Sequence, residues 1–119
     1  MPAFSRLAAA DFAYLTTTGR VTGRPHTIEI WFALEDGTLY LLSGGGEHAD
    51  WVRNLRRTSA VRVRIGSRTV AATARILRAG TATDARGREL LDAKYMGWRP
   101  GRRLSQWARE SLAVAIELP

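Results

Sequence analysis

Apolar and polar residues alternate in several short segments of the chain, and turn residues separate these segments. In 26–34 every second residue from Ile28 to Phe32 is apolar, which predicts a strand with one face in a core. Alternation of this kind, or a run rich in aromatic residues, leucine and threonine, marks five further segments. The six predicted strands are 12–18, 26–34, 39–43, 61–65, 70–76 and 112–118. Asp36-Gly37 is a strong hairpin signal between the second and third of them.

In two other short segments, the apolar residues are spaced as on one face of a helix. The first, 47–57, follows a triple glycine, begins with acidic residues and ends with arginines, the charge order that a helix dipole favours. Its predicted buried stripe is Trp51, Val52 and Leu55. A shorter apolar stripe over 104–108 includes Leu104, Trp107 and Ala108 and predicts one or two helical turns before the last strand.

A longer helix is predicted after Gly80, with Thr83 as its N-cap. Gly87 would lie inside it at a cost of about 1 kcal/mol relative to alanine, so its first turn is the weakest part of this prediction. The predicted buried positions of this helix are Leu90, Leu91, Ala93 and Tyr95.

Six strands with helices after the third and fifth predict an α+β fold. We expect a small, mainly antiparallel barrel that the C-terminal strand closes. A length of 119 residues suits one domain, 1–119, with one modest core.

The composition excludes several kinds of chemistry. The chain has no cysteine, which rules out disulfides, thiolate metal sites and cysteine nucleophiles. Its two histidines, His26 and His48, are far apart in the sequence, so no metal site is expected. No segment approaches the roughly 20 apolar residues of a membrane-spanning helix, and the N-terminus lacks the pattern of a secretory leader. We therefore expect a cytoplasmic protein with no integral membrane segment.

A net charge of +7 has two competing explanations. An anionic partner, such as a phosphorylated cofactor or a nucleic acid, would be attracted by it. A compositional bias towards arginine, spread over solvated faces, would give the same number. Arg62 and Arg64, which alternate with apolar residues in the fourth strand, fit a solvated outer face better than a phosphate site.

The turn between the first two strands carries more specific chemistry. Arg20, Thr22 and Arg24 lie there between glycines, so the turn offers guanidinium groups, hydroxyls and a backbone that a ligand can approach closely. These are groups that bind a phosphate. The turn has little structural need for them, which favours a ligand-binding role.

The order of motifs resembles one family of enzymes. The resemblance covers the chain from about residue 13 onwards and is densest between Leu15 and Leu55. The matching motifs are Leu15-Thr-Thr-Thr-Gly-Arg-x-Thr-Gly-x-Pro, a strand with an aromatic pair, Asp36-Gly37, Ser43 before glycines, and Trp51-x-x-Asn54-Leu55. Together they resemble the deazaflavin-dependent nitroreductase family, whose split β-barrel is similar to that of pyridoxamine 5′-phosphate oxidase-like flavoproteins.

The resemblance implies that the chain binds coenzyme F420, a deazaflavin with a phosphate and an oligoglutamate tail. It places Arg20, Thr22 and, by position, His26 at the phosphate, with Arg24 as a further cation beside them. The residues that it assigns to the deazaflavin ring and its surroundings are Trp31, Ser43, Gly44 and Trp51, and Asn54 is a further cofactor-binding residue. Val21, His26, Glu29 and Gly44 depart from the family, which often has lysine, arginine, proline and lysine at these positions.

The resemblance also implies the reaction, a hydride transfer from reduced F420 to an electron-poor small molecule such as a quinone, an enone or a nitro compound. Tyr95 and Trp98 match aromatic residues that cover the substrate, and Tyr95 and Ser43 are the candidate catalytic residues. Such an enzyme needs little acid–base apparatus, because the cofactor carries the reactivity. His48 is a second candidate proton donor, after Tyr95.

Two alternatives remain open at the level of the sequence. A barrel of this kind could bind FMN instead, since a phosphate site does not distinguish the two cofactors. A barrel without redox activity could bind nucleic acid or another polyanion through Arg62, Arg64 and the turn arginines, although no ladder of exposed aromatic residues supports base stacking. Relatives with this barrel commonly pair, so a homodimer is plausible.

Overall fold

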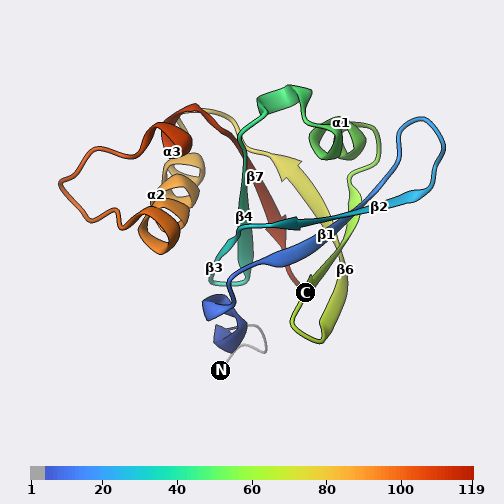
Figure 1. Cartoon of the computed structure of the whole chain (residues 1–119), viewed down its shortest axis with the longest axis horizontal. Coiled ribbons are helices and arrows are strands. Elements are labelled where there is room, and N and C mark those ends of the chain that lie inside the picture. The colour runs from blue at the N-terminus through green and yellow to red at the C-terminus, as the bar shows by residue number, and fades with distance from the viewer. Residues whose placement is uncertain (1–4) are drawn as a thin grey trace.

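Seven strands form one curled antiparallel sheet in the order β2-β1-β5-β6-β7-β4-β3 (Figure 1). The structure, a computed structural model, describes residues 5–119. The strands are β1 (Ala13–Thr18), β2 (Pro25–Ile30), β3 (Ala33–Glu35), β4 (Thr38–Ser43), β5 (Ala60–Ile65), β6 (Arg68–Ile76) and β7 (Leu112–Glu117). The predicted α+β class is confirmed, and the strands lie close to their predicted positions, but there are seven strands instead of six.

The additional strand arises because the predicted strand 26–34 is divided. Its first part, β2, pairs with β1, whereas its last part, β3, pairs with β4 on the other side of the sheet. Trp31 and Phe32 join the two parts, and the Phe32 side chain is fully buried. Burial of Phe32 in the apolar core within the curl of the sheet therefore anchors the bend. Alternation alone did not reveal the bend, because it continues through both parts.

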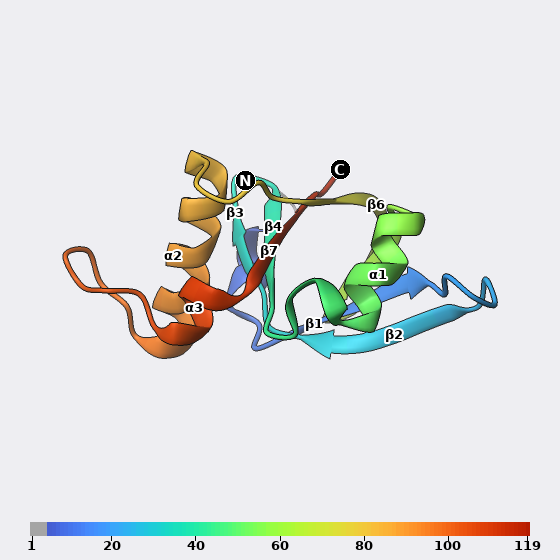
Figure 2. The same cartoon turned by 90° about the horizontal axis from the view of Figure 1, so that it is seen from above.

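The C-terminal strand does not close a barrel, contrary to the prediction. Strand β7 lies inside the sheet, between β6 and β4, and the two ends of the sheet are β2 and β3. The structure is therefore a split barrel whose two edge strands are β2 and β3. Helix α1 (Asp50–Arg57) packs at one end of the sheet, and α2 (Ala82–Met96) and α3 (Gln106–Glu110) pack together at the other (Figure 2).

Three details of the helices differ from prediction. The expected helix 47–57 begins as the 3₁₀ turn η2 (Gly46–His48) and becomes α-helical only at Asp50. The N-cap of α2 is Thr81 instead of Thr83, because the Thr81 hydroxyl accepts a hydrogen bond from the Asp84 amide at 3.2 Å. Ala93 is exposed, since it lies on the side of α2 away from the sheet.

Gly87 lies inside α2 and is buried against β4. A Cβ atom at this position would lie 2.6 Å from Cδ1 of Tyr40. The glycine therefore permits a close approach of helix to sheet, and the packing of the Tyr40 ring offsets its poor helix propensity.

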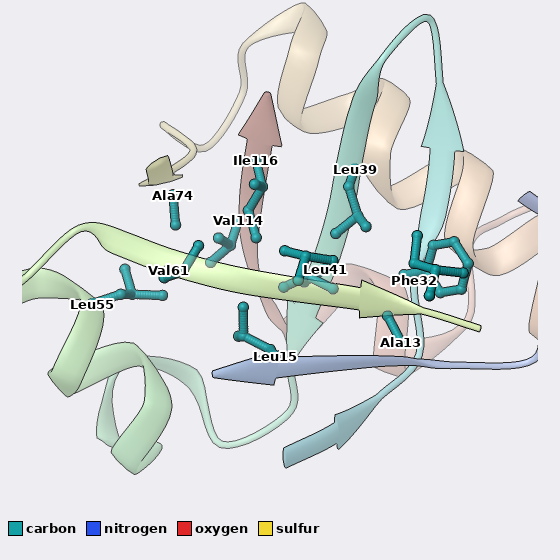
Figure 3. Packing of buried hydrophobic residues seen from close by; sticks show 12 residues of the cluster. Ala13, Leu15, Phe32, Leu39, Leu41, Leu55, Val61, Ala74, Val114 and Ile116 are labelled. Carbon is teal, nitrogen blue, oxygen red and sulfur yellow. The ribbon is translucent and has the colours of Figure 1, made fainter. Parts of the chain in front are cut away.

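The apolar core has two parts. The larger lies within the curl of the sheet and includes Leu15, Phe32, Leu41, Val63 and Ile116 (Figure 3). The smaller lies between the sheet and α2 and α3, around Leu42 and Leu91. The predicted burial of Val52, Leu55, Leu91 and Ala108 is confirmed.

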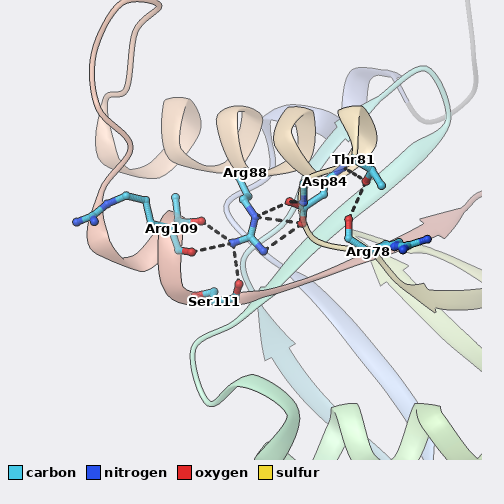
Figure 4. Close-up of polar contacts among 8 residues, drawn as sticks. Arg78, Thr81, Asp84, Arg88, Arg109 and Ser111 are labelled. Carbon is cyan, nitrogen blue, oxygen red and sulfur yellow. Dashed lines mark hydrogen bonds and ion pairs between the residues drawn. The ribbon is translucent and has the colours of Figure 1, made fainter.

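A buried ion pair holds α2 against the segment that leads into β7. The Arg88 Nε atom lies 3.1 Å from both carboxylate oxygens of Asp84, and its Nη1 atom donates to the carbonyl oxygens of Ala108 and Ser111 at 2.7 Å each (Figure 4). The side chains of Arg88 and Asp84 are 13% and 7% exposed. Arg88 thus supplies a donor to two carbonyl groups in α3 and in the turn between α3 and β7.

The C-terminal end of α2 holds the N-terminal 3₁₀ helix η1 (Ser5–Ala9). The Lys94 Nζ atom donates to the carbonyl oxygens of Ala8, Ala10 and Phe32 at 2.7–3.0 Å. The ammonium group also lies 3.8 Å from the centre of the Phe32 ring. Burial lowers the pKa of Lys94. One side chain therefore fastens the lead-in segment to the bend between β2 and β3.

An ion pair between β3 and α2 makes a contribution to the free energy of unfolding that depends on pH. Arg86 donates from Nε and Nη2 to the two carboxylate oxygens of Glu35 at 2.9 and 2.7 Å, which holds the pKa of Glu35 below its usual value. Glu35 therefore contributes stability that is complete above its unfolded-state pKa of 4.5 and is lost as the pH falls through its folded-state pKa.

We expect Glu35→Gln to lower the free energy of unfolding by about 0.5–1 kcal/mol at neutral pH, the range of a partly exposed pair. The difference from the wild type should shrink as the pH falls below 4.5 and then through the lowered folded-state pKa of Glu35, because the wild-type carboxylate then loses its charge. Urea denaturation at several pH values measures it. Glu110→Gln is the control, because the partner of Glu110 is the uncharged Gln106. A difference that does not change with pH would contradict the assignment.

Candidate functional site

A cavity of about 420 Å³ opens between the β1–β2 turn and helix α1. Residues of β1, β2 and the turn between them line one side of the cavity, and residues of α1 line the other. These elements lie together at one end of the molecule (Figure 2). The lining residues are Thr17, Gly19, Arg20, Val21, Thr22, His26, Thr27, Ile28, Asp50, Trp51 and Asn54. The fold thus brings together Arg20, Thr22, His26, Trp51 and Asn54 of the predicted cofactor residues.

Arg20 is fixed in this cavity by α1. Its Nη1 atom donates to Oδ1 of Asn54 at 2.9 Å, and its Nη2 atom pairs with Oδ1 of Asp50 at 3.0 Å. Its side chain is only 27% exposed, whereas that of Asp50 is 84% exposed. The guanidinium therefore has a defined direction before any ligand binds, and an exposed surface carboxylate occupies one of its donors.

Asn54 organises the turn from beneath. It is buried, its Oδ1 atom also accepts from the Arg20 amide at 3.1 Å, and its Nδ2 atom donates to the Thr17 hydroxyl at 3.1 Å. Thr17 lies in β1, Arg20 in the turn and Asn54 in α1. Asn54 therefore links β1, the turn and α1, and its contact with a ligand would be secondary to this role.

His26 and Gly19 form a close contact on the other wall. A Cβ atom at Gly19 would lie 2.6 Å from Nε2 of the exposed His26 and 3.0 Å from the Arg24 carbonyl oxygen, so the glycine leaves the space that the imidazole occupies here. The turn is closed by the Gly19 amide, which donates to the Arg24 carbonyl at 2.7 Å. The imidazole is thereby placed at the cavity wall beside the Thr22 and Arg20 positions.

Thr22 and Arg24 have different positions in the turn. The Thr22 hydroxyl accepts a hydrogen bond from the Arg24 amide at 3.2 Å, and Thr22 lines the cavity. The exposed Arg24 is not among the lining residues. Val21, at the tip, is 88% exposed.

A second cavity, of about 380 Å³, lies farther along β2 and is mainly aromatic and apolar. Its lining residues are Glu29, Ile30, Trp31, Leu42 and Trp107. Ile28 lines the first cavity, and the three residues that follow it, 29–31, line the second. Strand β2 and its bend therefore run past both cavities.

Trp31 presents a fixed aromatic surface to this second cavity. Tyr95 stacks on its indole with ring centres 4.3 Å apart and planes 1° apart, and Trp107 contacts it edge-on at 5.5 Å. Trp31 is nevertheless 45% exposed. Tyr95 supports one face of the indole, so the arrangement leaves aromatic surface for a planar ligand.

The Tyr95 hydroxyl is anchored to the backbone. It can donate a hydrogen bond to the carbonyl oxygen of Asp11, at 2.7 Å, or to that of Phe32, at 3.0 Å. It also accepts a hydrogen bond from the Phe32 amide at 3.1 Å. Burial raises the pKa of Tyr95 above its usual value. These contacts and this shift both favour a positioning role over proton donation.

The remaining predicted residues lie outside the first cavity. Ser43 is buried and its hydroxyl donates to the Gly46 carbonyl at 2.9 Å. Gly44 lines a small cavity beside Trp107. Trp98 lies in the loop after α2, where its indole N–H donates to the Arg102 carbonyl at 2.8 Å.

Sequence reasoning did not assign Asp50 and Trp107 to the site. Asp50 was interpreted only as a favourable charge at the start of a helix, and Trp107 only as an apolar helix position. The proximity of Asp50 to Arg20 depends on the packing of α1 against β1, and that of Trp107 to Trp31 on the packing of α3 beside the sheet. No local signal in the sequence reports either contact.

The described part of the chain lacks two other features, a metal-binding cluster and a membrane-spanning helix. Among residues 5–119, no group of three or more histidine, aspartate or glutamate side chains could hold a metal ion. Over the same residues, no helix is long and apolar enough to cross a membrane.

Solved structures with the same fold include proteins of several kinds. A conserved hypothetical protein of Mycobacterium tuberculosis superposes with a TM-score of 0.77 at 19% identity, over 97% of this chain and 79% of that one. An F420-H2 dependent reductase gives 0.69 at 19% identity, over 90% and 94%. A putative pyridoxamine 5′-phosphate oxidase of Listeria innocua gives 0.66 at 20% identity, over 92% and 85%. These likenesses confirm the predicted split-barrel fold.

A comparison with curated proteins finds no match. The sequence model of one family, described as F420H(2)-dependent quinone reductase, matches residues 3–119. The match spans both cavities and every predicted site residue. The chain therefore belongs to the F420H2-dependent quinone reductase family, which confirms the predicted oxidoreductase class and coenzyme F420.

Proposed function

We propose that this protein uses reduced F420 to reduce an electron-poor small molecule, a quinone, an enone or a nitro compound. The observation that supports the proposal is that two cavities lie along the same strand. Residues of β2 line the polar cavity around Arg20, and residues of β2 and its bend line the aromatic cavity around Trp31. A ligand with an anionic arm and a planar ring matches this sequence of surfaces.

The residues of the first cavity fit the phosphate end of the coenzyme. Arg20 supplies a guanidinium whose direction Asn54 fixes, and His26 and Thr22 supply an imidazole and a hydroxyl at the same wall. The absence of a Cβ atom at Gly19 leaves the space that the imidazole occupies. Arg20 would bind the phosphate in place of Asp50, and Arg24 would contribute long-range attraction from outside the cavity.

The residues of the second cavity fit a planar ring. Trp31 offers an indole that Tyr95 and Trp107 hold in place, so little side-chain entropy is lost when a ring stacks on it. When bound, F420 supplies the two-electron hydride chemistry, and the protein supplies orientation and exclusion of water. Trp51 would contact the coenzyme from α1 at the edge of the first cavity.

Ser43, Gly44 and Trp98 take lesser parts in this proposal. The Ser43 hydroxyl fixes the turn into η2 and so positions Gly44, which borders the ring-binding side near Trp107. Trp98 is assigned no contact with substrate, because its indole N–H is used within its own loop. The predicted homodimer and cytoplasmic location stay predictions.

Tyr95→Phe separates a positioning role from proton donation. Phenylalanine keeps the stacked ring, so we expect turnover to fall by less than about fivefold, whereas loss of a general acid costs roughly 100-fold or more. Loss of the hydroxyl contacts should lower the free energy of unfolding by about 1 kcal/mol. Steady-state kinetics with reduced F420 and a quinone measure the first effect, and denaturation the second. A large loss of kcat with unchanged KM would restore Tyr95 as the proton donor.

A binding and turnover experiment tests the proposed function directly. The protein is titrated separately with oxidised F420 and with FMN, and binding is followed by fluorescence. Reduced F420 is then supplied with one quinone, one enone or one nitro compound in turn. We expect F420 to bind more tightly than FMN and at least one acceptor to be reduced. Tighter binding of FMN, or binding of F420 without reduction of any acceptor, would contradict the proposal.

A further inference from the structure

The loop between α2 and α3 projects from one end of the molecule (Figures 1 and 2). Its residues line neither the Arg20 cavity nor the Trp31 cavity. This α2–α3 loop comprises residues 97–105. From 93 to 109 the sequence contains one lysine and four arginines and no acidic residue. The charge of this segment is therefore uncompensated along the chain.

The tip of the loop is a well-formed turn. The Arg102 amide donates to the Arg99 carbonyl at 3.1 Å across Pro100-Gly101, and Gly101 has φ 87°. Proline followed by a glycine of positive φ is the arrangement of a type II turn. The turn places Arg99 and Arg102 at its two ends, with Arg103 next to them.

The base of the loop is fastened to α2. The buried Asp92 carboxylate accepts from the Ser105 amide at 2.8 Å and from the Ser105 hydroxyl at 2.5 Å, and the Asp92 carbonyl accepts from the Trp98 amide at 3.2 Å. The Trp98 indole also donates to the Arg102 carbonyl across the loop. The loop is thus held open as a projecting structure instead of collapsing on the body.

The three arginines of the loop are available for a partner. The side chains of Arg99, Arg102 and Arg103 are exposed, and within residues 5–119 they form no hydrogen bond or ion pair. By contrast, Arg20, Arg86 and Arg88 each pair with a carboxylate. Beside the arginines, Met96 is 54% exposed and Trp98 half-buried, so apolar surface adjoins the charge.

We propose that the α2–α3 loop docks the protein on a bilayer surface that carries anionic headgroups. Guanidinium groups bind lipid phosphates through paired hydrogen bonds, and each basic residue near such a surface strengthens binding by about a factor of five. The Met96 and Trp98 side chains suit the boundary between headgroups and acyl chains. A nucleic acid would need basic groups spaced along a strand or stacking residues, and this loop offers one compact cluster. The β1–β2 turn lies at the other end of the molecule, so docking leaves the Arg20 cavity open (Figure 2).

Vesicle co-sedimentation tests the proposal with the full chain. The wild type is mixed at low salt with vesicles of phosphatidylglycerol and phosphatidylcholine, and with vesicles of phosphatidylcholine alone. The loop variant carries Arg99→Gln, Arg102→Gln and Arg103→Gln. The control variant carries Arg53→Gln, Arg62→Gln and Arg78→Gln, three exposed arginines outside the loop. Each variant loses three positive charges, so both have a net charge of +4 in place of +7.

We expect binding of the wild type to the anionic vesicles only. The loop variant should lose roughly 100-fold in affinity, from three arginines at about fivefold each, and the control variant less than about fivefold. Met96→Ser, made in the wild type, should also weaken binding to the anionic vesicles, although it does not change the net charge. Circular dichroism and F420 binding serve as checks that the variants are folded.

Three results would overturn the proposal. The first is no binding of the wild type to anionic vesicles at low salt. The second is an equal loss in the two triple variants, which would indicate net charge without a defined surface. The third is a loop-dependent binding to a DNA or RNA oligonucleotide that exceeds binding to the vesicles, which would assign the loop to nucleic acid.

Discussion

Replacing Arg88 with methionine is expected to lower the free energy of unfolding by about 3–5 kcal/mol, the range for breaking a buried ion pair by removing one partner. Methionine fills much of the same volume but carries no donor. The variant would leave the Asp84 carboxylate buried without its cation and the carbonyl oxygens of Ala108 and Ser111 without their donor (Figure 4). Unpaired buried polar groups are the main source of the loss.

Arg86→Met provides the matched control. Arg86 lies on the same helix two residues earlier, but its side chain is 48% exposed and its pair with Glu35 lies at the surface. Its loss should cost less than about 1 kcal/mol. Guanidinium chloride denaturation of the wild type and both variants gives the two differences. Equal, small effects would show that the buried pair adds no more than a surface pair.

A double variant, Arg88→Met with Asp84→Asn, separates the ion pair from the carbonyl contacts. Removing the charge of Asp84 should recover part of the loss, because no isolated carboxylate then remains buried. The recovery should be incomplete, since the carbonyl groups of Ala108 and Ser111 still lack a donor. Complete recovery would mean that the carbonyl contacts contribute nothing.

The second large effect concerns binding of the coenzyme. Arg20→Ala is expected to weaken F420 binding roughly 10- to 100-fold, the equivalent of one charged hydrogen-bonding group. Arg20→Lys should recover only part of this, because lysine keeps the charge but lacks the planar fork. Fluorescence titration with oxidised F420 measures both. Binding that is unchanged in Arg20→Ala would remove Arg20 from the site.

Asp50→Asn tests the same contact in the opposite direction. Asp50 pairs with Arg20 in the absence of ligand, so an anionic ligand has to displace its carboxylate. Removing this competitor should strengthen F420 binding by up to about fivefold, the range of an exposed pair. Glu47→Gln changes the charge equally on the neighbouring turn, where Glu47 pairs with Arg56 instead. A gain of the same size in Glu47→Gln would assign the effect to overall charge.

The local sequence was sufficient wherever neighbours along the chain decide the structure. Alternation located the strands within one or two residues, and β5 has the predicted single apolar face, with Val61, Val63 and Ile65 buried and Arg62 and Arg64 exposed. Such patterns are reliable because successive strand residues point to opposite faces. Arg20 could also be recognised as a ligand-binding candidate from its neighbours in the sequence, because it lies in a turn between glycines.

The tertiary structure decided everything that depends on partners distant in the sequence. The bend at Phe32, which moves β3 to the far end of the sheet, follows from burial of the Phe32 ring in the larger part of the core. The pairing of Arg20 with Asp50 and the support of Trp31 by Tyr95 and Trp107 join residues 30 or more positions apart. A one-dimensional pattern records which face of an element is apolar, but not which element covers that face. The sequence by itself therefore determined most of the elements and the family, whereas packing in three dimensions determined the division of β2 from β3 and the shape of the site.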